Sequence, residues 1–420
     1  MSFEQKSMKY GLIAEKLGHS YSKIIHEMLG RYEYELLPMP EEEVGVLLTS
    51  KAFDGINVTI PYKSTVIPYL DWISRQAKKI GAVNTVVNKN GVLYGYNTDY
   101  AGFTATLQRS GFDVSGKNAL VLGSGGTSKT VCTACRDLGA RSVFVASRRP
   151  GDGQISYEHS KEIAIDYIIN TTPAGMYPDT GKSAIEIGDY KGVLGVVDVI
   201  FNPLRTKLLL DCEDAGIPCA DGLYMLVTQA MASAELFTGV PVKRTEAERI
   251  YEALRNNTEN TVLTGMPGSG KTTVGKLLAE KTGKQFIDTD AELAKKIGNV
   301  ADFIRAHGEA EFRDKETEAI KEITANARGA VIATGGGAVL REENVRALRE
   351  NGMIFFIDRR LSLIATDESR PLSSNSEALK ARYAERRGIY EKTCDHRIIN
   401  NLTPDEAVKR IMKLQKGKRI

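Results

Sequence analysis

The feature that most limits the fold of this chain is the stretch TVLTGMPGSGKTTVG, which runs from Thr261 to Gly275. Within it, Gly265 to Thr272 matches the pattern GxxxxGK[ST], with an apolar strand before it and a helix after it. In that setting the backbone N–H groups of the loop and of the helix N-terminus bind phosphate oxygens. The stretch therefore predicts an α/β unit that binds a nucleotide, and a glycine-rich turn without a ligand is the weaker alternative.

The side chains of this loop have expected tasks. Lys271 should reach the β- and γ-phosphates, and the Thr272 hydroxyl should ligate Mg²⁺. The residues expected around the nucleotide are Gly268, Ser269, Gly270, Lys271, Thr272 and Thr273. ATP and Mg²⁺ are therefore the cofactors predicted for this part of the chain.

A second glycine loop, VLGSGGTSKT from Val121 to Thr130, lies in the long segment ahead of the first. It follows the strand NALVLG and precedes a helix, which is the order of a dinucleotide-binding unit. The next strand ends in ASRRP, where arginine suits the 2′-phosphate of NADP and an acidic residue would favour NAD. A basic surface turn is the alternative reading of SRR. The residues expected to bind NADP(H) are Gly123, Ser124, Gly125, Gly126, Thr127, Ser147, Arg148 and Arg149.

Length and composition limit the possible classes of protein. A chain of 420 residues exceeds one ordinary core and predicts two or three domains. The net charge of +3 gives no sign of nucleic-acid or membrane binding, and no run approaches the roughly 18 apolar residues of a membrane helix. Five cysteines do not make a disulfide framework, so we expect a cytoplasmic protein, with the CxxC pair Cys132 and Cys135 packed in a helix.

Five motifs follow the phosphate loop: FIDTD (286–290), EFRDKETE (311–318), ATGGGAV (333–339), SRPL (369–372) and AERRGIYEKTCD (384–395). Together, and in this order, they resemble shikimate kinase over about residues 258–420. The resemblance implies that Asp290 accepts the proton of the attacking hydroxyl and that Asp288 holds Mg²⁺ through water.

The same resemblance implies the remaining site of this half. Arg313 and Arg386 would hold the substrate carboxylate, and Arg370 in a lid would neutralise the transferring phosphoryl group. Gly335, Gly336 and Gly337 would let the substrate ring approach closely. Taken singly, these residues could equally be a helix cap, surface ion pairs and an ordinary turn. One departure concerns the lid, because LSLIATDESRPL has no arginine between Arg360 and Arg370, where the family usually carries one beside the adenine.

The amino-terminal half carries GHSYS (18–22), GINVTIPYK (55–63), GAVNTV (81–86), GYNTDYAG (95–102), NTTPAGM (170–176) and DGLYMLVTQA (221–230). This set resembles shikimate dehydrogenase along residues 1–255. The resemblance implies that Lys63 and Asp99 form the catalytic pair, in which an ammonium protonates the ketone oxygen and a carboxylate orients it. A structural ion pair is the alternative. It also implies that Ser20, Ser22, Thr59, Asn84 and Gln229 hold the substrate and that Gly222 contacts the cofactor.

Several positions depart from the usual dehydrogenase pattern. Lys16 and Lys23 replace prolines, and Phe201 replaces a tyrosine, which removes one hydroxyl from the substrate pocket. Between Arg149 and Asn170 there are too few residues for loop, helix and strand, so we expect an abbreviated cofactor domain on that side.

The predicted architecture is α/β throughout: a two-lobed dehydrogenase followed by a P-loop kinase domain with a parallel sheet. Residues 1–103 would form the substrate domain, completed by a helix at 229–255, residues 104–228 a Rossmann-like NADP domain, and residues 256–420 the kinase domain. The predicted function is reduction of 3-dehydroshikimate to shikimate and then phosphorylation of shikimate, in a protein that can form homo-oligomers.

Three alternatives remain. They are a quinate/shikimate dehydrogenase joined to a kinase for another small hydroxy acid, a non-catalytic sensor of nucleotide and shikimate, and a kinase whose front half only aids folding.

Overall fold

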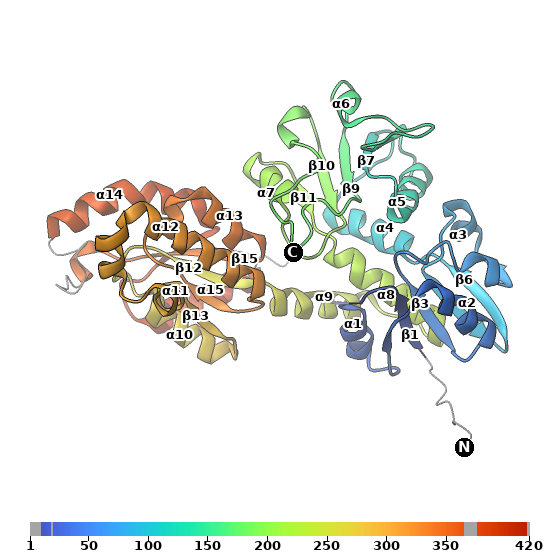
Figure 1. Ribbon diagram of the computed structural model, residues 1–420, viewed down its shortest axis with the longest axis horizontal. Coiled ribbons are helices and arrows are strands. Elements are labelled where there is room, and N and C mark those ends of the chain that lie inside the picture. The colour runs from blue at the N-terminus through green and yellow to red at the C-terminus, as the bar shows by residue number, and fades with distance from the viewer. Residues whose placement is uncertain (1–9, 18–19, 365–375, 418–420) are drawn as a thin grey trace, which may run out of the picture. The chain divides into compact units, whose positions relative to one another are not determined.

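The computed structural model describes residues 10–17, 20–364 and 376–417, and the chain divides into two units, Met1–Ala253 and Leu254–Ile420. Two sheets belong to the first unit and one to the second (Figure 1). Helices alternate with strands in both units, so the predicted α/β class is confirmed.

The first sheet of the amino-terminal unit is mixed, in the order β2-β1-β3-β5-β6-β4. Its strands are β1 (Tyr10–Ala14), β2 (Glu35–Pro38), β3 (Gly55–Val58), β4 (Trp72–Ile73), β5 (Thr85–Lys89) and β6 (Val92–Tyr96). The helices in this part are α1 (Ser22–Leu29), α2 (Glu41–Ser50), α3 (Arg75–Ile80) and α4 (Asp99–Ser110). β1, β2 and β3 run parallel, so their carboxyl ends, where site residues are expected, share one edge.

The second sheet is parallel, in the order β11-β10-β9-β7-β8. Its strands are β7 (Asn118–Leu122), β8 (Ser142–Ala146), β9 (Tyr167–Asn170), β10 (Gly195–Asp198) and β11 (Cys219–Ala220). Its helices are α5 (Gly126–Asp137), α6 (Tyr157–Ser160), α7 (Lys207–Asp214) and α8 (Leu223–Thr238), and α4 also packs against it. One face packs on α4, α5 and α8, and the other packs on α7. The parallel order is that of the predicted Rossmann-like domain.

Two details of this unit differ from the sequence-based expectation. The helix expected over 229–255 is two helices, because α8 ends at Gly239, whose φ of 70° only glycine adopts easily, and α9 (Arg244–Thr258) starts anew. The connection between Arg149 and β9 is short, as predicted, but it still holds one helical turn, α6, capped by the Ser156 hydroxyl.

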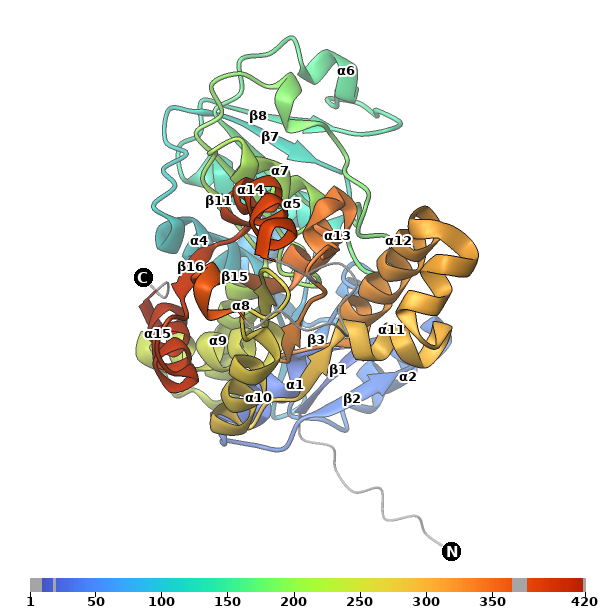
Figure 2. The same cartoon turned by 90° about the vertical axis from the view of Figure 1, so that its left-hand side faces the viewer.

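The carboxy-terminal unit has one parallel sheet, in the order β13-β14-β12-β15-β16. Its strands are β12 (Asn260–Thr264), β13 (Phe286–Asp288), β14 (Val331–Ala333), β15 (Gly352–Asp358) and β16 (His396–Ile399). Its helices are α10 (Lys271–Thr282), α11 (Thr289–Ile297), α12 (Val300–Asn326), α13 (Glu342–Glu350), α14 (Ser376–Thr393) and α15 (Pro404–Gly417). α10 and α15 cover one face and lie side by side (Figure 2), whereas α12, α13 and α14 cover the other.

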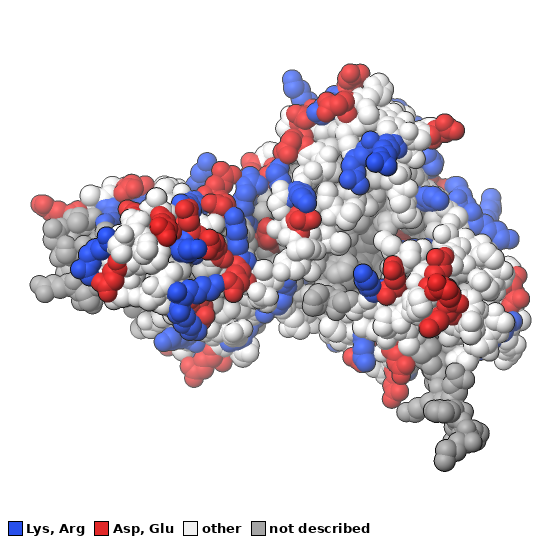
Figure 3. Space-filling view, viewed as in Figure 1, with Lys and Arg blue, Asp and Glu red and all other residues white. Residues whose placement is uncertain are grey.

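The distribution of surface charge and the environment of the cysteines agree with the expectations from the composition. Lysine and arginine are interspersed with aspartate and glutamate on the face shown in Figure 3. Over the ranges given above, no helix has the length and apolar character needed to cross a membrane. Cys132 and Cys135 are buried on α5, and burial raises the pKa of the Cys135 thiol to about 12, so the predicted packing role holds for both.

The amino-terminal unit contains a buried histidine. His26 on α1 stacks on the Tyr34 ring at 4.0 Å, and its Nδ1 lies 2.6 Å from the Tyr32 hydroxyl. Only 1% of His26 is exposed, and this burial lowers its pKa from 6.5 to about 3. The folded unit therefore holds His26 neutral at pH values where the unfolded chain is protonated.

This difference predicts acid lability of the amino-terminal unit. A histidine with a lowered pKa contributes its full stability above the unfolded value of 6.5 and loses it as the pH falls toward about 3. The free energy of unfolding should fall by about 1.4 kcal/mol per pH unit in that window because of this group. Urea titrations between pH 4 and 7 would measure it through Trp72, the sole tryptophan of the sequence. His26→Phe should flatten the slope, and an equally steep slope in that variant would contradict the assignment.

Candidate active sites

A cavity of about 670 Å³ lies in the amino-terminal unit between residues of its two sheets. It is bordered by the ends of β1 and β3 and the start of α4 from the first sheet, and by Val199 and Phe201 from the second. The predicted site residues that line it are Ser20, Ser22, Thr59, Lys63, Asn84, Asp99, Thr127, Gly222 and Gln229. Residues from six separate sequence motifs are thus brought to one place.

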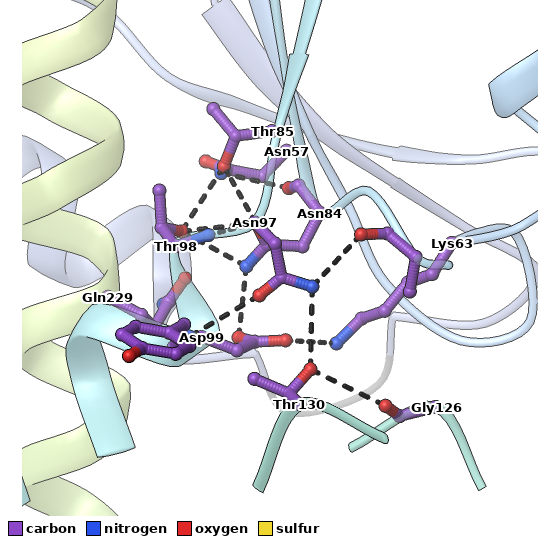
Figure 4. A network of polar contacts seen from close by, with 12 residues as sticks. Asn57, Lys63, Asn84, Thr85, Asn97, Thr98, Asp99, Gly126, Thr130 and Gln229 are labelled. Atoms are coloured by element: carbon purple, nitrogen blue, oxygen red, sulfur yellow. Dashed lines mark hydrogen bonds and ion pairs between the residues drawn. The ribbon is translucent and has the colours of Figure 1, made fainter. Parts of the chain in front are cut away.

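Lys63 and Asp99 form an ion pair in this cavity (Figure 4). Lys63 Nζ donates to Asp99 Oδ2 at 2.6 Å, and the two side chains are only 14% and 12% exposed. Lys63 follows β3, and Asp99 is the first residue of α4, so the two come from different elements. The pair has the geometry of a proton donor held by an orienting carboxylate.

Asn84 fixes the orientation of that carboxylate. Its Nδ2 donates to Asp99 Oδ1 at 2.9 Å, while its Oδ1 accepts from the Thr98 backbone N–H at 2.7 Å. The predicted substrate residue Asn84 therefore also positions Asp99. Gln229 on α8 lines the same cavity, and its Nε2 donates to the Leu226 carbonyl at 2.9 Å.

Asn97 was missed by the sequence reasoning, although it lies in the GYNTDYAG motif. Its Nδ2 donates to the Ala82 carbonyl at 3.0 Å and to Thr130 Oγ1 at 3.4 Å. Thr130 lies on α5, one turn after the glycine loop, so Asn97 links the turn before Asp99 to the helix that follows the glycine loop (Figure 4).

The glycine loop between β7 and α5 can accept a dinucleotide. A Cβ added to Gly125 or Gly126 would meet no atom within 4 Å, so a phosphate can approach the N-terminus of α5 there. Ser147, Arg148 and Arg149 follow β8, which pairs with β7, and both arginines are exposed. Packing also requires a glycine at position 222, because a Cβ there would lie 2.1 Å from the Val199 carbonyl oxygen.

In the carboxy-terminal unit the phosphate loop joins β12 to α10. Lys271 is buried and donates to the carbonyls of Gly265 at 2.9 Å and Met266 at 3.0 Å. Ser269 Oγ is buried without a hydrogen-bond partner among the described residues, which suits a loop whose remaining partner is a ligand.

Thr272 and Asp288 meet beside the loop. The Thr272 hydroxyl donates to Asp288 Oδ2 at 3.0 Å, while Asp288 Oδ1 caps α11 by accepting from the backbone of Asp290 and Ala291. Asp288 is therefore both a helix cap and a candidate metal residue. No cluster of three acidic, histidine or cysteine side chains suited to a metal lies in the described part of the chain. Two oxygens suit a Mg²⁺ ion that keeps water and phosphate ligands.

The three glycines after β14 bring the rest of this site together. A Cβ at Gly335 would lie 2.4 Å from Asp290 Oδ1, and one at Gly336 would lie 2.7 Å from the Pro267 ring in the phosphate loop. A Cβ at Gly337 would lie 2.3 Å from Arg313 Nη1. The predicted base, the phosphate loop and a predicted carboxylate-binding arginine therefore all contact one segment, at distances that exclude side chains on it.

Arginines gather at the same segment. Arg386 on α14 is buried and donates to the Gly336 carbonyl at 3.2 Å, and its Nε has no partner in the described ranges. Arg313 on α12 donates to Glu316 at 2.8 Å and to Glu309 at 3.0 Å. Burial lowers the pKa of Arg382, which lies one turn earlier on α14, and the charge of Arg386 lowers it further. Such a cluster favours an anionic ligand.

Two of these residues were not predicted, and one predicted residue cannot be placed. Arg382 lies four positions before Arg386, and Glu316 lies three positions after Arg313. Residues at these spacings share one face of a helix, so the sequence could have indicated both. Burial raises the pKa of Glu316, against the opposing effect of Arg313. Arg370 lies outside the described residues.

Comparison with known proteins agrees with this division. Residues 267–416 match the shikimate kinase family, and residues 12–86 match the shikimate dehydrogenase substrate binding domain. The shikimate dehydrogenase (NADP(+)) of Clostridium perfringens (strain 13 / Type A) is 37% identical over 268 residues, which cover 59% of this chain and 98% of that protein.

Two solved structures extend the similarity to the fold. A chorismate mutase/shikimate 5-dehydrogenase fusion protein from Clostridium acetobutylicum is 36% identical with a TM-score of 0.56, over 59% of this chain and 97% of that one. Shikimate 5-dehydrogenase from Thermus thermophilus, in complex with NADP(H) and shikimate, is 30% identical with a TM-score of 0.54, over 59% of this chain and 99% of that one. Both predicted families are confirmed. This chain belongs to the shikimate dehydrogenase family and carries a shikimate kinase domain carboxy-terminal to the dehydrogenase.

Proposed function

We propose that the amino-terminal unit reduces 3-dehydroshikimate to shikimate with NADPH, and that the carboxy-terminal unit phosphorylates shikimate to shikimate 3-phosphate with MgATP. The observation that carries the proposal is the pair of polar sites on one chain: Lys63 with Asp99 in one cavity, and Asp290 with Arg313 beside a phosphate loop. The family membership of each part, and the shikimate and NADP(H) in the Thermus thermophilus structure, support it.

In the reduction, NADPH bound at the glycine loop supplies a hydride. Lys63 donates a proton to the ketone oxygen as negative charge develops there, and Asp99 holds the ammonium in place through the 2.6 Å contact. Asn84 keeps the carboxylate turned toward Lys63. Ser20, Ser22, Thr59 and Gln229 offer the hydroxyl and amide groups for the substrate's own polar groups. Arg148 and Arg149 favour NADP over NAD by meeting the 2′-phosphate.

In the phosphorylation, MgATP supplies the phosphoryl group. Asp290 accepts the proton of the attacking hydroxyl, and Arg313 and Arg386 hold the substrate carboxylate with their paired donors. Lys271 leaves its two loop carbonyls to bind phosphate oxygens, and Thr272 and Asp288 hold Mg²⁺. The sequence supplies Arg370 to stabilise the charge on the transferring group.

The deciding experiment is a coupled assay of the whole chain with 3-dehydroshikimate. NADPH loss is followed by absorbance and shikimate 3-phosphate by mass spectrometry, before and after ATP is added. We expect shikimate without ATP, shikimate 3-phosphate with it, and much slower reduction with NADH. Binding of all ligands without any product would contradict the proposal and favour a sensor. Reduction without phosphorylation of shikimate would favour a kinase for a different hydroxy acid.

Gly337→Ala tests the carboxylate site of the kinase domain. The added Cβ would overlap the Arg313 guanidinium, which must then leave its position against the glycine segment. Loss of one charge-assisted contact should raise the KM for shikimate by about 10- to 100-fold, with dehydroshikimate reduction unchanged. Gly388→Ala on α14 is the matched control, since its Cβ would meet nothing within 4 Å. Equal KM values for the two variants would contradict the role of Arg313.

A further inference from the structure

Arg359 lies against the phosphate loop of the kinase domain. It follows the last residue of β15, and β15 pairs with β12, the strand that leads into the loop. The two segments are in close contact, since a Cβ at Gly265 would lie 2.5 Å from the Ile357 carbonyl oxygen. Arg359 Nη1 lies 3.7 Å from the position of a Cβ on Gly270, the residue directly before Lys271. The guanidinium is thus at the end of the loop where a bound nucleotide's phosphates meet the start of α10.

Three side chains around this point each leave a buried polar atom without a partner among the described residues. These atoms are Arg359 Nε, Ser269 Oγ and Asn400 Oδ1. Ser269 and Asn400 are 1% and 2% exposed, and Asn400 Nδ2 donates to the Ser269 carbonyl at 2.8 Å. Buried polar atoms almost always have partners, so three such atoms at one loop indicate a ligand that supplies them.

Arg359 also lines a cavity of about 380 Å³. Its lining includes Arg359, Arg360, Asn401 and the apolar side chains of Leu361 and Ile399. Its one carboxylate, Asp358, is already bonded to Arg397 and to the Tyr383 hydroxyl. Within the described ranges, no carboxylate pairs with Arg359 or Arg360, so this cavity keeps a positive character.

We propose that Arg359 is a nucleotide-binding residue, which donates to phosphate oxygens of the ATP held by the Gly265–Thr272 loop. A planar guanidinium presents paired donors that match phosphate, and Nη1 already lies beside the loop. The inference rests on the nucleotide binding proposed above and assigns one further residue to it.

The test is the binding of MgADP to the whole chain by calorimetry, with NADP⁺ present to fill the dehydrogenase. R359Q should raise the Kd for ADP by about 10- to 100-fold, and R359K, which keeps the charge but not the paired donors, should lie between. R346Q on α13 is the matched control, since it removes an arginine of the same unit that is paired with Glu342. Its Kd should equal that of the unchanged protein.

Thermal melting separates a ligand contact from a structural role. If Arg359 binds phosphate, R359Q should melt like the unchanged protein without ADP and gain less stability when ADP is added. A lower melting temperature in both conditions, with an unchanged Kd, would overturn the inference. If R359Q fails to fold, R359K gives the decision, because it keeps the positive charge and removes the paired donors. It should weaken ADP binding without lowering the melting temperature, and unchanged binding would overturn the inference. Failure of the unchanged protein to bind ADP would instead refute the proposed function.

Discussion

Lys63→Met is expected to lower kcat for 3-dehydroshikimate reduction by about 10²- to 10⁴-fold, the range typical of a lost general acid. Methionine keeps the length of the side chain but cannot donate a proton to the substrate oxygen. Phosphorylation of added shikimate should continue at its normal rate, because the kinase site lies in the other unit. Stopped-flow absorbance of NADPH measures the first rate, and a coupled ADP assay measures the second.

A structural ion pair between Lys63 and Asp99 would give a different pattern. Lys63→Met leaves Asp99 as a nearly buried charge without its partner, which destabilises the unit whichever role the pair has. The double variant Lys63→Met/Asp99→Asn removes both charges and should recover much of the lost stability. With a purely structural pair, activity would return together with stability. With a catalytic pair, melting temperature recovers while reduction stays slow, and recovery of reduction would refute the catalytic role.

Asp290→Asn is expected to lower kcat of the kinase by about 10²- to 10⁴-fold while ATP binding persists. Asparagine keeps the shape of the side chain beside Gly335 but accepts no proton from the substrate hydroxyl. The cap of α11 survives, because Asp288 accepts from the backbone at position 290 and not from its side chain. Single-turnover phosphorylation with saturating shikimate gives the rate, and calorimetry gives the nucleotide affinity.

Glu292→Gln is the matched control for this variant. Asp290 and Glu292 both lie in the first turn of α11, where a negative charge stabilises the helix by about 0.3–1 kcal/mol. Glu292 forms an ion pair with Lys295 on the exposed face of this helix. The control should therefore lose similar stability without losing phosphorylation. Equal loss of activity in both variants would show that Asp290 acts through the helix and not on the substrate.

The motifs predicted the individual loops because loop geometry is set locally. A GxxxxGK[ST] run between a strand and a helix gives the same backbone whatever surrounds it, so the roles of Lys271 and Thr272 could be predicted from spacing alone. Alternating apolar runs predicted the α/β class for the same reason. One local signal was overlooked. Asn90 and Gly91, with φ of 52° and 81°, form the tight turn of a hairpin that adds β6 to the first sheet.

The packing of distant segments determined what spacing could not. Nothing near Asn84 in the sequence indicates that its amide is used to hold Asp99, or that Asn97 reaches Thr130 on α5. From the sequence alone the three glycines could equally form an ordinary turn, whereas in the fold Asp290, Pro267 and Arg313 lie against them. These contacts join residues tens of positions apart, which side-chain volume and hydrogen-bond geometry bring together only in the folded chain.

The sequence by itself therefore determined the two families and the order of their motifs, and it predicted the residues of each site, because these depend on local backbone geometry and residue type. Only the tertiary structure decided the 2.6 Å contact of Lys63 with Asp99, the glycine segment that meets Asp290 and Arg313, and the position of Arg359 at the phosphate loop. Those are long-range distances, and they are fixed by how the strands of each sheet pair and how the helices pack on them.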